Sequence, residues 1–175
     1  MARAQTKGRL LLAAPALSDP NFDRTVIYVL EHSESGALGL VLNRPSKLPA
    51  AAALPSWAER ATEPSMLFYG GPVERGGVIG LGRPANDAWP TAIDLSEQPE
   101  VHDPRIDQIR LFNGYSGWDA GQLEAELAQS AWIVLDAEPA DIFTAEPTGL
   151  WRAVLQRQHG RLAWLATYPD DVAAN

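Results

Sequence analysis

The feature that most constrains the fold is a pair of strand-like runs, RTVIYVLEH and ALGLVLNRP, separated by the four residues SESG. The first run is rich in β-branched and aromatic residues, and the gap contains Gly36. This pattern predicts a β-hairpin with a four-residue loop at residues 33–36. Both runs are apolar with little alternation, so we expect the hairpin to be covered on both of its faces.

Short apolar runs and turn residues place further elements along the chain. Residues 84–105 are rich in Pro and acidic side chains, which predicts a long surface excursion with at most short strands. Helices are predicted at 49–61, interrupted by Pro55, directly after Asp119, and at 149–158, with Gly160 as the residue that ends the helix. Further strands are predicted within 8–17, where Pro15 ends the strand, and at 65–69, 78–81, 106–112, 131–136 and 161–168.

The stretch LFNGYSGWDAGQLEAEL, residues 111–127, is predicted to lead from a strand into a helix through a glycine-rich loop at 114–118. Asp119 stands where a helix N-cap is expected, and Gln122 completes a capping box. The glycine spacing matches neither the phosphate loop nor the dinucleotide motif, and a nucleophile elbow at Ser116 fails because position 118 is Trp. We therefore interpret the glycines as positions that let Tyr115 and Trp118 pack tightly.

Composition limits the classes of protein to which the chain can belong. The 175 residues, 46% of them hydrophobic, predict one folded domain spanning 1–175, with flexible tails at 1–7 and 170–175. The chain has no cysteine, which excludes disulfides, thiolate nucleophiles and cysteine-bound metals. The net charge of −8 argues against direct contact with nucleic acid.

No run of residues reaches the roughly 20 apolar positions that a membrane helix needs. The N-terminal run LLLAAPAL follows three basic residues, as a signal peptide does, but it contains Pro15 and leads into the polar segment SDPNFDR. We interpret it as an internal strand. The expectation is a cytoplasmic protein without membrane association, and no motif indicates a cofactor.

Histidines and acids supply the only candidates for catalysis. His32 stands beside Glu31, and His102 stands beside Asp103, but neither pair has the spacing of a metal motif. Neighbouring residues on a strand face opposite sides of the sheet, so Glu31 and His32 are not expected to converge. The alternative hypothesis is an enzyme, a hydrolase or transferase, that uses acid and base groups from a set of four residues. These are Asp19, Glu31, His32 and Asp119.

Several uncommon segments occur together and in a fixed order: LLLAAPALSDPNFDRTVIYVLEH, GALGLVLNRP, GGPV and GYSGWDAGQLEAEL. With these segments the chain resembles the bacterial YqgE/AlgH family. The resemblance implies an α+β fold in which helices surround a mixed, strongly bent, partly barrel-like sheet. Members of this family are described as uncharacterised proteins or transcriptional regulators. The resemblance supplies no agreed catalytic residues for this chain.

The favoured hypothesis is a non-catalytic binding or regulatory protein that recognises a protein partner or a small-molecule ligand. The segment FYGGPVERGG is either a tight connection between strands or a wall of a cleft beside the 114–118 loop. The predicted binding residues come from three segments. They are Asn43, Arg44, Gly70, Gly71, Pro72, Val73, Gly114, Tyr115, Ser116, Gly117 and Trp118.

Overall fold

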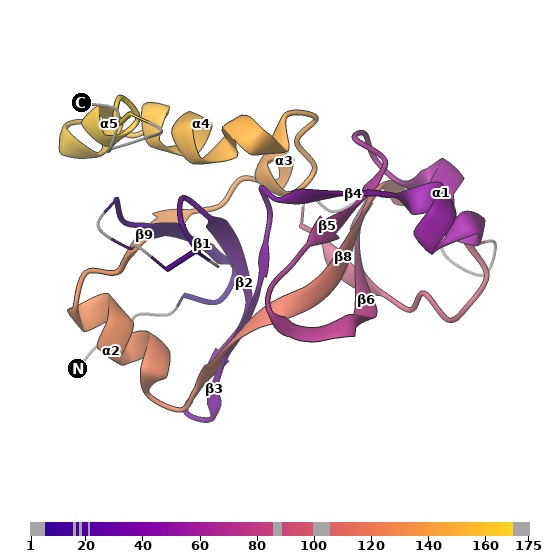
Figure 1. Ribbon diagram of the computed structural model, residues 1–175, viewed down its shortest axis with the longest axis horizontal. Coiled ribbons are helices and arrows are strands. Elements are labelled where there is room, and N and C mark those ends of the chain that lie inside the picture. The colour runs from indigo at the N-terminus through magenta and orange to yellow at the C-terminus, as the bar shows by residue number, and fades with distance from the viewer. Residues whose placement is uncertain are drawn as a thin grey trace.

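The computed structural model describes residues 6–15, 17, 19–20, 22–85, 89–99 and 106–169, and within them nine strands form one mixed sheet (Figure 1). The sheet bends strongly and does not close into a barrel (Figure 1). Its main path runs β4-β5-β8-β3-β2-β1-β9, and β6 and β7 extend it from β8. The strands are β1 Arg9–Ala13, β2 Val26–Ser33, β3 Gly36–Val41, β4 Pro45–Pro49, β5 Met66–Tyr69, β6 Val73–Pro84, β7 Thr91–Ile93, β8 Ile106–Asp119 and β9 Trp132–Asp136.

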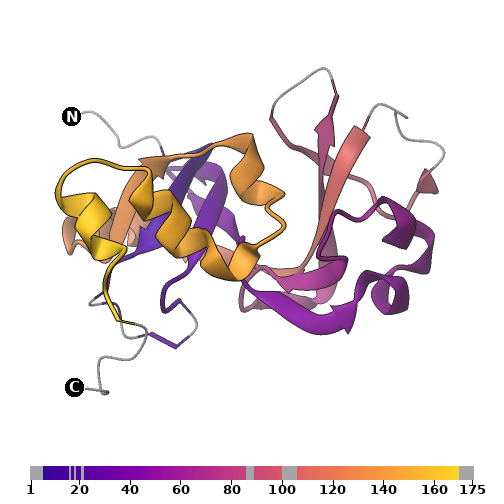
Figure 2. The ribbon, with the colours of Figure 1, turned by 90° about the horizontal axis from the view of Figure 1, so that it is seen from above.

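Helices cover the sheet at three places. The helices α3, α4 and α5 lie across β1, β2 and β9, whereas α1 and η1 lie at the opposite end of the molecule (Figures 1 and 2). Helix α2 packs on the other face of β1, β2 and β9. The bounds are α1 Ala50–Ala53, η1 Pro55–Arg60, α2 Gln122–Ala128, α3 Pro139–Ile142, η3 Pro147–Gly149, α4 Leu150–Gln156 and α5 Arg161–Leu165.

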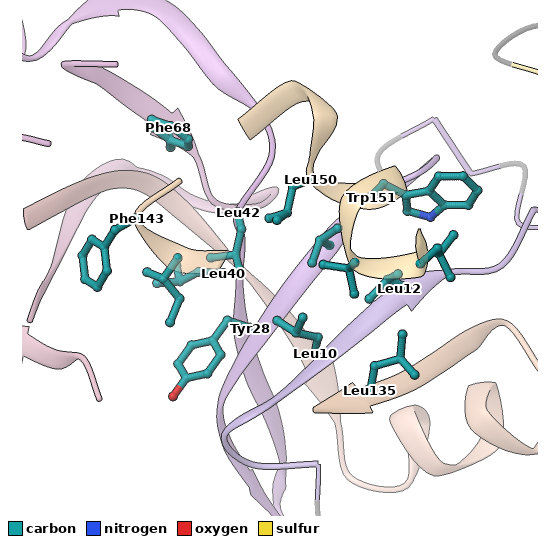
Figure 3. Close-up of a cluster of buried hydrophobic side chains, with 14 of the residues drawn as sticks. Leu10, Leu12, Tyr28, Leu40, Leu42, Phe68, Leu135, Phe143, Leu150 and Trp151 are labelled. Atoms are coloured by element: carbon teal, nitrogen blue, oxygen red, sulfur yellow. The ribbon is translucent and has the colours of Figure 1, made fainter. Parts of the chain in front are cut away.

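The predicted hairpin of β2 and β3 is present and buried on both faces. Val26 and Tyr28 pack into a core beneath α3–α5, which Figure 3 shows, while Ile27 and Val29 pack toward α2. The loop length was wrong, because Ser33 pairs with Gly36 and leaves a two-residue turn at 34–35. A third core lies beneath α1 and η1, against β5 and β8.

Strand β8 connects the two halves of the sheet. Its first part pairs with β5 in parallel and with β6 in antiparallel orientation, and residues 116–119 pair with β3. Gly114 lies between these two parts with a φ of +67°, a backbone conformation that residues with a side chain rarely adopt. The predicted loop at 114–118 is therefore wrong, since the glycines continue the strand and bend it.

The start of α2 also differs from the prediction. Asp119 is still paired with Gly36 in the sheet, so it is the last residue of β8 and not an N-cap. Gly121, with a φ of +78°, occupies the N-cap position. Only one half of the predicted capping box forms, because the Asp119 N–H donates to Oε1 of Gln122 at 3.1 Å.

Residues 161–168 were predicted as a strand but begin with helix α5. Leu162 and Leu165 both pack against the core beneath α4, and a separation of three residues suits a helical face. The Arg152 guanidinium donates to the Tyr168 carbonyl at 2.8 Å and holds the following turn. Gly160 precedes α5 and does not end α4, whose C-cap is Arg157.

The predicted excursion and tails are partly within the described residues. Within 84–99 the described positions contain one short strand, β7, which agrees with the prediction. Strand β6 is longer than predicted, because it already begins at Val73.

Thr6 and Lys7 of the predicted N-terminal tail bind His32 and Glu31 through their side chains. His102 and Asp103 lie outside the described residues. No helix in the described part of the chain is both long and apolar enough to cross a membrane.

Candidate functional site

The three segments predicted to form a binding surface converge at Gly70. The Gly70 N–H donates to the Asn113 carbonyl at 2.8 Å, and the buried Ser116 hydroxyl donates to the Gly70 carbonyl at 3.2 Å. The Arg44 carbonyl accepts the Tyr69 N–H at 2.8 Å. The backbones of segments 43–44, 70–73 and 114–118 therefore lie side by side, and we call this place the glycine junction.

Backbone fills the space inside the glycine junction. A Cβ atom on Gly71 would lie 2.1 Å from the Tyr115 carbonyl carbon, and a Cβ on Gly114 would lie 2.4 Å from the Gly71 oxygen. Val73 continues this contact by pairing with Tyr115. The connection between β5 and β6 thus packs directly on β8, as a tight connection between strands does, and the glycines make the approach possible.

The side chains of Asn43 and Arg44 hold the segment after β3 to the segment that leads into β2. Asn43 accepts the Val26 N–H at 2.9 Å and donates to the Arg24 carbonyl at 2.9 Å. The half-buried Arg44 guanidinium donates to the Asp23 carbonyl at 3.0 Å. Burial lowers the pKa of Arg44, whereas the nearby ionisable groups of Asp23, Tyr69 and Asp19 raise it.

Tyr115 and Trp118 pack on opposite faces of β8. Tyr115 lies against the core beneath α3–α5, and a Cβ on Gly117 would lie 3.4 Å from its ring. Trp118 belongs to the core beneath α2, where its indole N–H donates to Glu126 at 2.9 Å. These residues are therefore near one another along the strand, but their side chains do not form one surface.

Next to the glycine junction, an exposed arginine stacks on a tyrosine. The Arg75 guanidinium carbon lies 5.1 Å from the centre of the Tyr69 ring, within the range of a cation–π contact. Tyr69 is also next to Arg44, because its N–H donates to the Arg44 carbonyl at 2.8 Å. We call Arg44, Tyr69 and Arg75 the Tyr69 cluster. Both Tyr69 and Arg75 belong to the FYGGPVERGG segment, but nothing in the sequence indicated that the two side chains would stack.

The acid and base candidates bind separate partners. Glu31 forms an ion pair with Lys7 at 2.9 Å, and His32 turns to the other side, as predicted for neighbours on a strand. Asp119 ends β8, and Asp19 lies in the loop after β1, where its carbonyl accepts two backbone N–H groups. Among the described residues, no cluster of three or more His, Asp and Glu side chains is arranged to hold a metal ion.

His32 takes part in a hydrogen-bond chain that the sequence did not predict. Its Nδ1 lies 2.7 Å from the Thr6 hydroxyl, and its Nε2 lies 2.8 Å from a Glu124 carboxylate oxygen. The order of hydroxyl, imidazole and carboxylate is that of a nucleophilic triad. Thr6 is 0% exposed, however, so a substrate has no access to its hydroxyl. These two hydrogen bonds anchor the segment before β1 to β2 and to α2.

Comparison with known proteins shows the family of this chain. A family model described as AlgH-like matches residues 10–163. The chain belongs to the AlgH-like family. Among its AlgH-like relatives, a UPF0301 protein of Streptomyces coelicolor is 44% identical over 96% of this chain and 94% of the relative. A UPF0301 protein of Mycobacterium leprae is 43% identical over 96% of this chain and 90% of the relative.

Two solved structures share the AlgH-like fold. The crystal structure of protein DIP2367 from Corynebacterium diphtheriae superposes with a TM-score of 0.87 at 31% identity, covering 93% of this chain and 92% of that one. The solution structure of AlgH from Pseudomonas aeruginosa gives 0.68 at 32% identity, covering 98% of each chain. The predicted family and the predicted α+β class with a bent mixed sheet are therefore confirmed.

Proposed function

We propose that this AlgH-like protein is a non-catalytic binding protein and that its Tyr69 cluster recognises an acidic segment of a partner protein. The observation that carries the proposal is the exposed Arg75 guanidinium stacked at 5.1 Å on Tyr69. Arginine and tyrosine are enriched among the residues that dominate protein interfaces. The stacking also holds the arginine in one position before a partner arrives, which reduces the entropy lost on binding.

Charge supports an acidic partner segment. The whole chain has a net charge of −8. Within the cluster the Arg44 guanidinium is near Asp23 and Asp19, whereas the exposed Arg75 guanidinium on Tyr69 is the group that an acidic segment would meet. A carboxylate can accept paired hydrogen bonds from a guanidinium, which favours arginine at such contacts. The same net charge opposes binding to a phosphate backbone, so we assign any regulatory role to contact with another protein and not with DNA.

A capture experiment tests this proposal with a matched control. The tagged wild-type chain, Arg75→Ala and Arg161→Ala are incubated with lysate of cells that natively express the protein, and captured proteins are quantified by mass spectrometry. Arg161 is exposed on α5, so its replacement removes the same charge at a distant place. We expect at least one partner to be lost with Arg75→Ala, to be kept with Arg161→Ala, and to weaken at high salt.

Two outcomes of this experiment would contradict the proposal. If Arg75→Ala and the wild type retain the same proteins in the same amounts, the Tyr69 cluster is not the recognition surface. A partner that is lost equally with both variants reports a loss of overall charge, and it also counts against the cluster.

A further inference from the structure

The bend of the sheet leaves a cavity of ≈ 420 Å³ away from the glycine junction. One wall comes from β2 and β3, with Leu30 and Leu38, and the other comes from β6 and β7, with Leu81 and Ala92. Small-molecule sites in proteins typically measure about 300–1,000 Å³ and are lined mainly by apolar side chains. The cavity has the size and the apolar walls of such a site.

Tyr28 places one polar atom within these apolar walls. The residue lines the cavity and is 7% exposed, and its hydroxyl points away from the packed cluster of leucines (Figure 3). The fully buried side-chain polar atoms that lack a partner in the described residues are Arg110 Nε and Asn113 Oδ1, so the Tyr28 hydroxyl is not one of them. Burial raises the pKa of Tyr28, so the phenol keeps its proton at neutral pH and can donate it. A phenol that faces a cavity can donate its hydrogen bond to water or to a ligand that displaces the water.

Two opposite charges stand among the residues that line the cavity. Lys7 Nζ lies 2.9 Å from each carboxylate oxygen of Glu31. Their side chains are 60% and 69% exposed, so separating them costs little, because exposed ion pairs contribute only small free energies. One cation and one anion at the same rim favour a ligand that carries both charges over one that carries either alone.

We propose that this cavity binds a free α-amino acid with a large apolar or aromatic side chain. The ligand's carboxylate faces Lys7 and its ammonium group faces Glu31, in place of the ion pair between them. The apolar side chain lies against Leu30, Leu38 and Leu81, and the Tyr28 hydroxyl hydrogen-bonds to the ligand. This site is independent of the Tyr69 cluster and does not depend on the function proposed for it.

Calorimetric titration of the full chain tests the ligand class. The probes are L-phenylalanine, L-tryptophan and L-leucine, with L-alanine and two singly charged analogues, 3-phenylpropionate and phenethylamine, for comparison. We expect saturable binding of the large amino acids and binding at least about tenfold weaker for L-alanine and both analogues, because each lacks part of the proposed contacts. No saturable binding, or equal binding of a singly charged analogue, would overturn the proposal.

Three variants locate the bound amino acid. Ala92→Trp fills the cavity from β7, whereas Thr91→Trp adds the same group to the neighbouring exposed residue, which does not line it. Tyr28→Phe removes only the hydroxyl. We expect Ala92→Trp to weaken binding at least about tenfold, Tyr28→Phe to weaken it up to about tenfold, and Thr91→Trp to leave it unchanged. Unchanged binding by both Ala92→Trp and Tyr28→Phe would place the ligand elsewhere and refute the site, and thermal unfolding of each variant verifies that it is folded.

Discussion

At the scale of single residues, the Glu126 carboxylate fixes the packing of two tryptophans. One of its oxygens accepts the indole N–H of Trp118 at 2.9 Å and that of Trp132 at 2.7 Å. The two rings meet edge to face, and both are nearly buried. Glu126→Ala leaves two buried donors without an acceptor, so we expect it to lower the free energy of unfolding by about 2–4 kcal/mol. Urea denaturation followed by tryptophan fluorescence measures this loss.

Two further variants separate the hydrogen bonds from the charge of Glu126. Glu126→Gln keeps an acceptor oxygen and is expected to lose less stability than Glu126→Ala. Glu146→Ala removes the same charge at an exposed position, where surface substitutions change stability by about 0.5 kcal/mol or less. If Glu126→Ala is no more damaging than Glu146→Ala, the carboxylate does not hold the tryptophans.

At the scale of elements, the fold depends on the close approach of the β5–β6 connection to β8. A Cβ at Gly71 would lie 2.1 Å from the Tyr115 carbonyl carbon, whereas one at Gly76 would meet nothing within 4 Å. We expect Gly71→Ala to destabilise the protein by about 3 kcal/mol or more, because backbone must move and a strained φ persists. Gly76→Ala is the matched control and should be tolerated, so equal stability of the two variants in urea would show that the junction yields easily.

Local sequence was enough to predict some elements and not others. The β2–β3 hairpin was predictable because the continuous apolar residues of its two strands indicate burial on both faces. The bend in β8 was not, since glycines mark turns and bends alike, and the deciding contact between Gly71 and Tyr115 is distant in sequence. Helix α5 was missed because five residues are too few to distinguish a helical from a strand period.

Of the two candidate sites, the sequence predicted the segments of one and gave no indication of the other. The sequence marked the segments of the glycine junction, and these do meet at Gly70. It gave no sign of the cavity at Tyr28, because a tyrosine inside a strand-like apolar run has the pattern of an ordinary core residue. Only the bend of the sheet, which brings β6 and β7 opposite β2, opens space in front of its hydroxyl.

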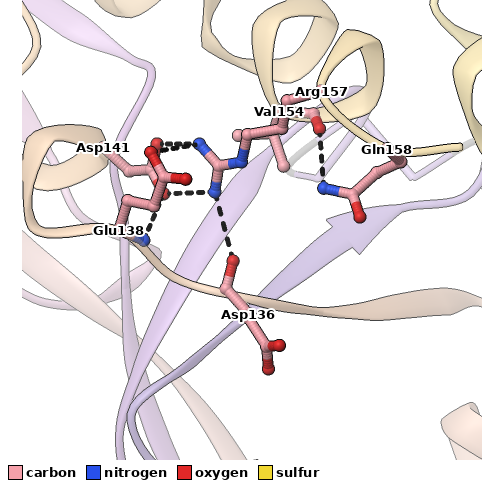
Figure 4. A network of polar contacts seen from close by, with 6 residues as sticks. All are labelled: Asp136, Glu138, Asp141, Val154, Arg157 and Gln158. Atoms are coloured by element: carbon pink, nitrogen blue, oxygen red, sulfur yellow. Dashed lines mark hydrogen bonds and ion pairs between the residues drawn. The ribbon is translucent and has the colours of Figure 1, made fainter.

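At the scale of the whole molecule, polar contacts join the helical layer to the sheet. Arg157, the C-cap of α4, binds the buried Asp141 carboxylate of α3 through two hydrogen bonds of 2.6 and 2.7 Å, and it donates to the Asp136 carbonyl of β9 (Figure 4). The hydrogen bond to Asp141 raises the pKa of Arg157. This pair joins α3, α4 and β9, while Arg110 makes the corresponding link toward the other half of the sheet.

Arg110 is 1% exposed on β8 and donates to the carbonyls of Thr144 at 3.1 Å and Glu63 at 2.9 Å. Its guanidinium lies 4.3 Å from the centre of the Phe68 ring. Burial lowers the pKa of Arg110 to about 10, so the side chain still carries its charge at neutral pH. In the described residues its hydrogen bonds go to carbonyls and to no carboxylate, and these bonds with the Phe68 ring offset the cost of burying the charge.

Removing this link tests how far the molecule depends on it. Arg110→Ala leaves a cavity and two carbonyls without donors, so we expect a loss of about 3–5 kcal/mol in urea denaturation. Arg110→Met fills most of the space without a buried charge and should lose less. Arg83→Ala, which breaks the exposed ion pair with Asp107, should cost no more than about 1 kcal/mol. If Arg110→Met is as stable as the wild type, the apolar stem and not the bridge between segments is what stabilises the fold.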